Sequence, residues 1–217
     1  MRAKVGFTGS VDAGKDRMTD LTLSLWRPYK LKKSAMAVPS FDSTHAVRFD
    51  LPNGSVRTGG DAGERVLLVP TSALDDLVLS APPEAVEALG RALGAAIGRR
   101  AAARMDPKSA PIDAFVTLLA GEAAIAGVGV LSIERWGRAL VVVVEDSPLS
   151  GTILAPLIAA AVEAASGKRV ACALLSRDER TARVLIGSEM GIARAREWIA
   201  SGVPWGEALV KLHGGGV

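Results

Sequence analysis

Cysteine and histidine are scarce in this 217-residue chain, which contains one cysteine and two histidines. The single thiol, Cys172, cannot form an internal disulfide, so we expect a reducing, cytoplasmic environment. A structural zinc site uses about four Cys or His ligands, which is more than the whole chain offers. The composition therefore excludes a disulfide-rich secreted fold and a zinc-stabilised one.

The residue patterns that catalysis commonly uses are missing as well. The sequence has neither a G-x-S-x-G nucleophile elbow nor an H-E-x-x-H metal motif. Cys172 lies in an apolar segment, where burial makes a thiol unreactive. We therefore expect a non-enzymatic protein, with no cofactor and no metal ion, that acts by binding.

No apolar run is long enough to cross a membrane. The longest, residues 153–165, spans about thirteen residues and contains Glu163, whereas a spanning helix needs about twenty apolar residues. The first residues also lack the apolar core of a signal peptide. Hydrophobic residues make up 49% of the chain and aromatic residues only 4%, which predicts a folded protein with an aliphatic core.

Positive charge is concentrated near the N-terminus. The chain has a formal charge of +3, but residues 1–40 alone carry +5. We interpret residues 1–44 as a basic leader that either docks onto an acidic partner or stays solvated. The docking residues would be Arg27, Lys30, Lys32 and Lys33. The leader lacks the stacking aromatics of nucleic-acid-binding proteins, so a nucleic-acid partner is not expected.

Residues 9–15, GSVDAGK, match the phosphate-loop pattern G-x-x-x-x-G-K and resemble the phosphate loop of elongation-factor GTPases. The next residue is Asp16, where a working loop has the Ser or Thr that holds Mg²⁺. The only asparagine is Asn53, so the guanine-recognition motif Asn-Lys-x-Asp is also missing. Nucleotide binding by Gly9 to Lys15 stays open as one alternative, and a glycine-containing loop without a ligand is the other.

The remaining sequence predicts short strands followed by alternating helices and hairpins. Asn53-Gly54 is the strongest two-residue hairpin signal, because both positions of that turn need positive φ. Proline, glycine and hydrophobic periodicity then delimit the other elements. The predicted strands cover residues 45–51, 55–58, 65–69, 128–134, 139–145, 169–175 and 181–186. The predicted helices cover residues 71–79, 83–105, 111–125, 150–166 and 190–201, with a short helix opened by Pro204.

This order predicts an α+β fold in which an antiparallel sheet of hairpins packs against helices. Residues 141–144 are all valine and show no alternation, so we expect both faces of that strand to be covered. We divide the chain into the leader of residues 1–44, a single domain over residues 45–213 and a flexible tail over residues 214–217.

Three glycines, Gly90, Gly94 and Gly98, form a stripe along one predicted helix. Each glycine inside a helix costs about 1 kcal/mol relative to alanine, so something should require close approach there. Either the helix packs tightly against another element, or the stripe forms the wall of a groove for a ligand or partner. The residues assigned to such an interface or groove are Gly90, Leu93, Gly94, Ile97, Gly98, Phe115, Leu119 and Trp136.

Residues 86–188 resemble the 4-vinyl-reductase-type domain, which is similar to the Bet-three-like subunits of the TRAPP tethering complex. The matching segments are LGRALGAAIGRRAA, VVVVEDSP and the last hairpin, VACALLSRDERTARVLIG. The resemblance implies an α+β fold, frequent dimerisation, and either sensing of small apolar ligands or scaffolding. It would place a ligand between the helices around Leu93, Ile97, Phe115 and Leu119. Some members bind zinc through a cysteine cluster, which this chain lacks.

Our first functional hypothesis is a non-enzymatic scaffold or regulatory subunit that acts through protein–protein contacts, as part of an assembly or as a homo-oligomer. The second is a sensor that holds a small apolar ligand in the helix–sheet core, and the third is the nucleotide-binding protein described above. Molar mass in solution, co-purified ligand and nucleotide titration separate the three.

Overall fold

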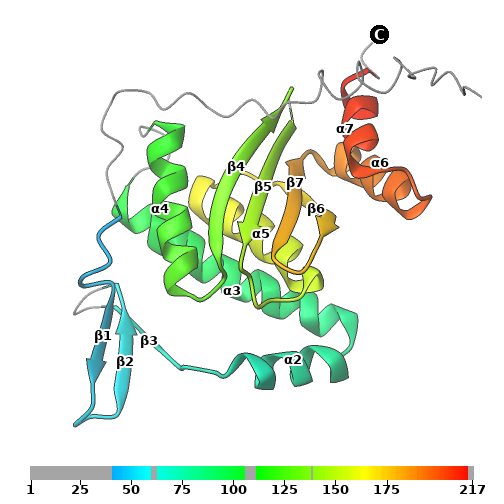
Figure 1. Cartoon of the computed structure of the whole chain (residues 1–217). Coiled ribbons are helices and arrows are strands. Elements are labelled where there is room, and N and C mark those ends of the chain that lie inside the picture. Colours follow the sequence, from blue (N-terminus) through cyan, green and yellow to red (C-terminus); the bar gives the residue numbers. More distant parts are fainter. Residues whose placement is uncertain (1–40, 60–62, 106–110, 138, 215–217) are drawn as a thin grey trace, which may run out of the picture.

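The computed structural model describes residues 41–59, 63–105, 111–137 and 139–214. The predicted α+β fold is confirmed, with one four-stranded and one three-stranded antiparallel sheet (Figure 1). The phosphate-loop match at residues 9–15, the basic residues Arg27, Lys30, Lys32 and Lys33, and residues 215–217 lie outside the described residues. No helix in the described part of the chain combines the length and the apolar character needed to span a membrane.

The larger sheet consists of two hairpins joined in the order β4-β5-β7-β6. Its strands are β4 (Val130–Trp136), β5 (Ala139–Glu145), β6 (Ala171–Arg177) and β7 (Thr181–Gly187). Both predicted hairpins are confirmed, and Trp136 pairs with Ala139 across the first turn. The edges of the sheet are β4 and β6, which do not pair with each other.

Helices cover both faces of this sheet, as the valine run predicts. On one face Val142 and Val144 pack with α5 (Gly151–Ser166), which in turn lies along α3 (Pro83–Arg104). On the other face Val141 packs with α6 (Glu189–Ala200) and α7 (Trp205–Gly214). Because neighbouring strand residues point to opposite faces, a continuous apolar strand is the pattern expected of a sheet buried on both sides.

The contact between α3 and α5 is close enough that only glycine fits at three positions of α3. A Cβ added at Gly90 would lie 2.8 Å from the carbonyl oxygen of Ile153, and at Gly94 it would overlap the backbone of Leu157. Gly98 meets the carbonyl oxygen of Ala161 in the same way. The glycine stripe therefore lies at a tight helix–helix contact, as the packing alternative expects.

The second sheet is small and stands away from the main body (Figure 1). It contains β1 (Val47–Asp50), β2 (Ser55–Thr58) and β3 (Glu64–Val66) in sequential order. Strand β3 ends three residues earlier than predicted. The predicted hairpin between β1 and β2 is confirmed, but the two-residue turn is wrong.

Asp50 pairs with Ser55, which leaves a four-residue loop over residues 51–54. In this loop only Gly54 has positive φ. Asn53 is held by the carboxylate of Asp50, which accepts from its backbone N–H and from its side-chain amide. These hydrogen bonds from Asn53 to the Asp50 side chain stabilise the four-residue loop and compete with the two-residue turn that Asn53-Gly54 favours.

Two further helices, α2 (Thr71–Ser80) and α4 (Ile112–Ile125), complete the fold. Helix α2 buries none of its residues fully and contacts the main core through Leu74 and Val78. Helix α4 packs between α3 and β4. The helix boundaries predicted from proline and glycine agree with α2 to α6 within one or two residues, and α7 begins directly after Pro204, as predicted. The small sheet lies on the side of the molecule away from α6 and α7 (Figure 1).

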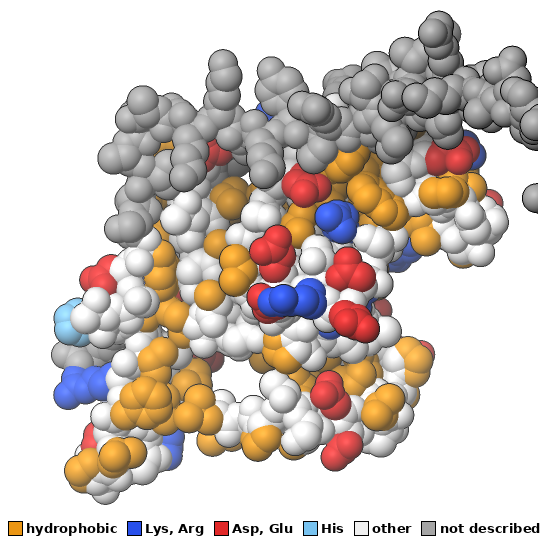
Figure 2. All heavy atoms as spheres, in the orientation of Figure 1, with side chains coloured by type: hydrophobic (Ala, Val, Ile, Leu, Met, Phe, Trp, Pro, Cys, Tyr) orange, Lys and Arg blue, Asp and Glu red, His pale blue; other side chains and the backbone are white. Residues whose placement is uncertain are grey.

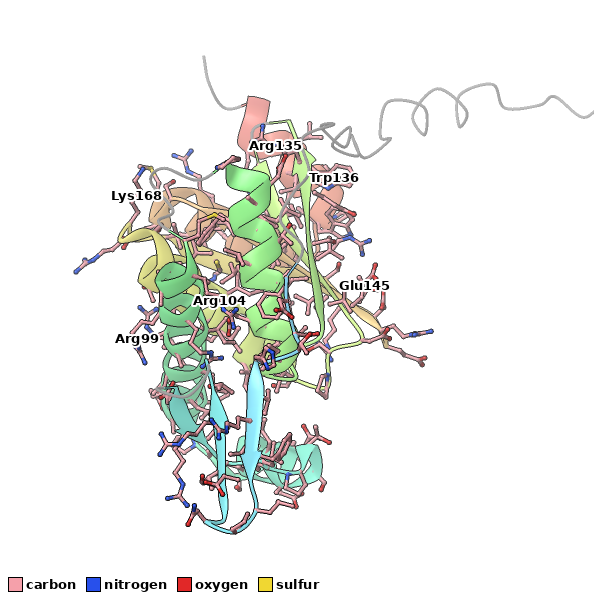
Figure 3. The ribbon with its side chains drawn as sticks, turned by 90° about the vertical axis from the view of Figure 1, so that its left-hand side faces the viewer. Arg99, Arg104, Arg135, Trp136, Glu145 and Lys168 are labelled. Carbon is pink, nitrogen blue, oxygen red and sulfur yellow. The ribbon has the colours of Figure 1, made fainter. Side chains whose placement is uncertain are left out.

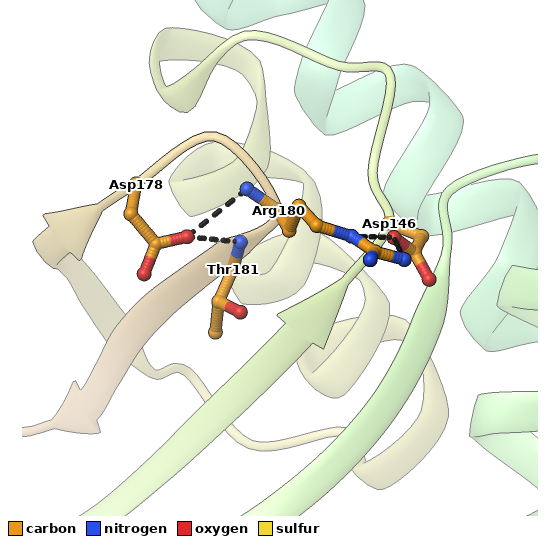
Figure 4. A network of polar contacts seen from close by, with 4 residues as sticks. All are labelled: Asp146, Asp178, Arg180 and Thr181. Atoms are coloured by element: carbon orange, nitrogen blue, oxygen red, sulfur yellow. Dashed lines mark hydrogen bonds and ion pairs between the residues drawn. The ribbon is translucent and has the colours of Figure 1, made fainter.

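The turn between β6 and β7 is organised by two carboxylates (Figure 4). Asp178 Oδ1 accepts hydrogen bonds from the backbone N–H groups of Arg180, at 3.0 Å, and Thr181, at 2.6 Å. These bonds hold the pKa of Asp178 below its ordinary value. The guanidinium of Arg180 then donates twice to Asp146 Oδ1, at 2.9 and 2.7 Å, which ties the turn to the end of β5.

Candidate functional site

The residues that the sequence assigned to a groove do not share one cavity. Ile97 is fully buried in the main core and Leu119 packs at its margin, whereas Leu93 is 38% exposed. Trp136 lies on the opposite face of the sheet, where its ring meets that of Trp205 edge-on at 5.2 Å between centroids. The sheet itself separates Trp136 from Ile97, so a single groove cannot include both.

A different set of polar residues surrounds a cavity of about 470 Å³ between the small sheet and helices α3 and α4. We call this the Thr58 cavity. Its lining combines charged and hydroxyl side chains with two glycines and one alanine. The lining residues are Asp42, His45, Thr58, Gly59, Gly63, Glu64, Arg100, Ala103, Arg104 and Glu122.

Glu122 is the buried carboxylate in the lining of this cavity. It belongs to α4 and is only 1% exposed, and its carboxylate faces two arginines one turn apart on α3. Arg100 Nε donates to Glu122 Oε2 at 2.9 Å, and Arg104 Nε lies 2.6 Å from Oε1. The arginines share a face because residues four apart on a helix lie one above the other.

The surrounding residues hold the two guanidinium groups in place. The ring of Phe41 lies over the guanidinium carbon of Arg104 at 4.9 Å, and Phe41 packs where a Cβ at Gly121 would otherwise be. Glu64 of β3 is 54% exposed and lies 3.6 Å from Arg100 Nη1. Figure 3 shows Arg104 between α3 and α4, whereas its neighbour along the helix, Arg99, points away from the body.

Two buried polar atoms at this cavity lack a hydrogen-bond partner within the described part of the protein. One is the hydroxyl oxygen of Thr58, a residue that is 6% exposed. The other is Glu122 Oε1, whose contact with Arg104 is an ion pair without the alignment of a hydrogen bond. Leaving a buried polar atom without a hydrogen-bond partner costs about 1–3 kcal/mol, so its presence in a folded protein calls for an explanation. Thr58 and Glu122 both line the same cavity.

Asp42 lies at the rim of the cavity and is locally bound. Its Oδ1 accepts from the backbone N–H of Thr44 at 2.9 Å. That bond, with smaller contributions from His45 and Arg104, holds the pKa of Asp42 below its ordinary value. Asp42 is therefore a charged residue whose hydrogen bonding is satisfied within its own loop.

A second cavity, of about 730 Å³, lies between α3, α5, the edge strand β6 and α6. Its central charges are already paired, because Arg91 Nη2 lies 2.8 Å from Glu163 Oε2. Arg196 Nη2 donates to the carbonyl oxygen of Cys172 at 2.6 Å. The thiol of Cys172 is itself buried, which raises its pKa to about 12. The Thr58 cavity is the better candidate site, because its lining includes a buried hydroxyl, that of Thr58, with no hydrogen-bond partner among the described residues.

Metal binding receives no support from this geometry. In the described ranges, no three His, Cys, Asp or Glu side chains come close enough together to hold an ion. The sequence analysis missed the Thr58 cavity, because Thr58, Arg100 and Glu122 belong to segments far apart in the chain. One signal was available: Glu122 interrupts the apolar second half of α4, LLAGEAAI, and a buried carboxylate requires a partner.

Comparison with known proteins gives a match in structure and none in sequence. No protein-family model matches the chain, and no curated protein matches it. Among solved structures, the chain is similar to the phenol-responsive sensory domain of the transcription activator PoxR, solved with phenol. The two share 18% sequence identity with a TM-score of 0.51, over 79% of this chain and 98% of that domain. The likeness shows a shared fold, and it does not single out the 4-vinyl-reductase-type family to which the sequence bears a resemblance.

Proposed function

We propose that this chain is a small-molecule sensor whose ligand binds in the Thr58 cavity. One observation carries the proposal: the buried hydroxyl of Thr58 has no hydrogen-bond partner among the described residues, and Thr58 lines a cavity together with Glu122 and its two arginines. The volume of about 470 Å³ lies within the range of small-molecule sites, about 300–1,000 Å³. No catalytic step is assigned to the chain.

The fold likeness supports this proposal over the scaffold hypothesis. The similar domain is one that responds to phenol, and 98% of its length is matched by this chain. The proposal transfers only the general role of binding a small organic molecule. The place of the ligand comes from the cavity of this chain and replaces the site expected between the helices around Leu93 and Phe115.

Titration calorimetry tests the proposal with phenol, benzyl alcohol and benzoate as probes. At least one probe should bind the wild-type protein, and Thr58→Val should weaken that binding, because valine keeps the shape and removes the hydroxyl. Thr71→Val is the matched control, since Thr71 begins α2 and is exposed. Failure of all three probes to bind, or equal binding by Thr58→Val, would contradict the proposal.

Self-association is a second candidate function, which one observation favours. Several large apolar side chains near the small sheet are exposed, and Figure 2 shows hydrophobic atoms gathered over this part of the surface. They are Phe49, Leu51, Leu67, Leu68 and Val69. Apolar patches of this kind commonly mark contact surfaces, and a second copy is the occupant expected of a homo-oligomer. The molar mass by light scattering should then be that of a dimer or larger, and should fall in Leu67→Ser/Leu68→Ser.

A further inference from the structure

Gly121 lies inside α4, although glycine is among the poorest helix formers. The backbone there is ordinary helix, so the conformation does not require a glycine. A neighbouring side chain requires it instead. The three nearest atoms that an added Cβ would meet all belong to the ring of Phe41, and the Cβ would overlap them. Gly121 therefore provides a seat on α4 for the ring of Phe41.

The same ring also contacts α3. The guanidinium carbon of Arg104 lies 4.9 Å from the centre of the Phe41 ring, a distance at which a cation and an aromatic face attract each other. Arg104 lines the Thr58 cavity and forms an ion pair with Glu122 of α4. Phe41 thus joins the two helices that carry the buried ion pairs of the cavity.

The chain that follows this ring forms part of the cavity wall. We call residues 41–46 the strap. Asp42 and His45 of the strap line the cavity. At the far end of the strap Ala46 is buried, and its carbonyl oxygen accepts a hydrogen bond from the N–H of Gly59, just after β2, at 3.1 Å. The strap is therefore anchored to the small sheet at one end and to α4, through the aromatic ring, at the other.

From these contacts we infer that Phe41 is a positioning residue of the ligand site proposed above. Seated at Gly121, its ring fixes the strap on one side and Arg104 on the other, so that both meet a bound molecule in one arrangement. The inference rests on the proposed function and adds to it a residue that sets the affinity of the site. Phe41 is itself outside the lining, so it acts through the strap and Arg104.

A substitution at Gly121 should have opposite effects on stability with and without the ring. In Gly121→Ala the new methyl group displaces the ring, because the two would occupy the same space. In a Phe41→Ala background the seat is empty, so the same methyl group fits and alanine favours the helix. Gly121→Ala should therefore lower the urea midpoint of the wild-type protein and raise that of Phe41→Ala. A lower midpoint in both backgrounds would contradict the seat.

Titration calorimetry with phenol, benzyl alcohol and benzoate measures the effect on the site itself. Gly121→Ala and Phe41→Ala should each weaken the binding of a probe at least about fivefold, the lower end of typical coupling between two sites. Phe41→Tyr keeps the ring and should retain the wild-type affinity. Gly187→Ala is the matched control, because its new methyl group meets only the side chain of Ile192, at an ordinary contact distance of 3.5 Å.

The double variant Phe41→Ala/Gly121→Ala should bind a probe as weakly as Phe41→Ala alone, because both changes empty one seat. Losses that multiply would overturn the inference, since the ring and the seat would then act separately. Wild-type affinity in Phe41→Ala would also overturn it and would leave the ligand site standing. If none of the probes binds the wild-type protein, the proposed function is wrong and the inference fails with it. Should Gly121→Ala fail to fold by circular dichroism, Phe41→Ala compared with Phe41→Tyr still decides.

Discussion

Gly94 in α3 lies against the backbone of Leu157 in α5 so closely that no side chain fits between the two helices. The same relationship recurs one turn before and one turn after, where Gly90 and Gly98 meet Ile153 and Ala161. Three glycines at four-residue spacing therefore set the distance between the helices that back the larger sheet. The packing contacts made by this close approach offset the helix propensity that each glycine loses relative to alanine.

Replacing Gly94 with alanine should destabilise the protein by about 2–3 kcal/mol, the scale of overpacking in a core. The added methyl group would overlap the carbonyl of Leu157, and backbone cannot move aside as a flexible side chain can. Chemical denaturation followed by circular dichroism measures the change.

Gly191→Ala in α6 is the matched control. Its new methyl meets mainly the Ser188 hydroxyl, at 3.3 Å, so the free energy of unfolding should change by less than about 1 kcal/mol. Equal effects of the two substitutions would contradict the packing explanation.

Most of the fold could be predicted from local sequence because its elements are delimited by residues with strong conformational preferences. Pro82-Pro83 opens α3, and Gly167, at φ 70°, ends α5. The helix predicted over residues 150–166 is confirmed although it contains Pro156, which removes a helical hydrogen bond and whose ring packs beside Gly90. The prediction failed at the strand expected over residues 65–69. That strand ends at Val66, and the side chains of residues 67–69 are exposed.

The Thr58 cavity could not be predicted in the same way. Its residues come from β2, β3, α3 and α4, and only the pairing of distant elements brings them together. The glycine stripe, by contrast, was visible in the sequence, but periodicity alone cannot distinguish a helix contact from a groove. What decides between them is the position of α5, which long-range packing determines.

The ion pairs of Glu122 supply a second test. Glu122→Gln should lower the free energy of unfolding by about 3 kcal/mol, because it leaves two guanidinium groups in a partly buried site without their carboxylate. Urea denaturation measures the loss. Glu87→Gln is the matched control: Glu87 is exposed on α3, and the change there should stay within about 0.5 kcal/mol. A loss at Glu122 no larger than at Glu87 would show that the buried pairs do not contribute as the structure indicates.

The turn between β6 and β7 should depend on pH through Asp178. Its pKa is lowered in the folded protein by the backbone N–H groups of Arg180 and Thr181, so the folded state favours the carboxylate. The contribution is therefore present above the ordinary aspartate pKa of 3.8 and is lost as the pH falls through the lower folded-state value. NMR should show the amide shifts of Arg180 and Thr181 titrating below pH 3.8, and Asp178→Ala should remove that transition. Glu179→Gln, in the same turn, should leave it in place.

Cys172 should be unreactive in the folded protein although it lies beside the larger cavity. Its side chain is 3% exposed, and burial raises its pKa to about 12, so at pH 8 almost none of it is the reactive thiolate. The carbonyl of the same residue is bound by Arg196, which holds α6 against the edge strand and keeps the thiol covered. Ellman's reagent should therefore react slowly with the native protein and immediately with the chain unfolded in about 6 M guanidinium chloride.

Arg196→Gln, which removes the hydrogen bond to the carbonyl oxygen of Cys172, should speed the reaction of the native protein, whereas Arg194→Gln, at an exposed position on α6, should not. Rapid labelling of the native wild-type protein would show that the thiol is open to solvent through the cavity, and that the sheet edge is less firmly covered than the contacts of α6 indicate.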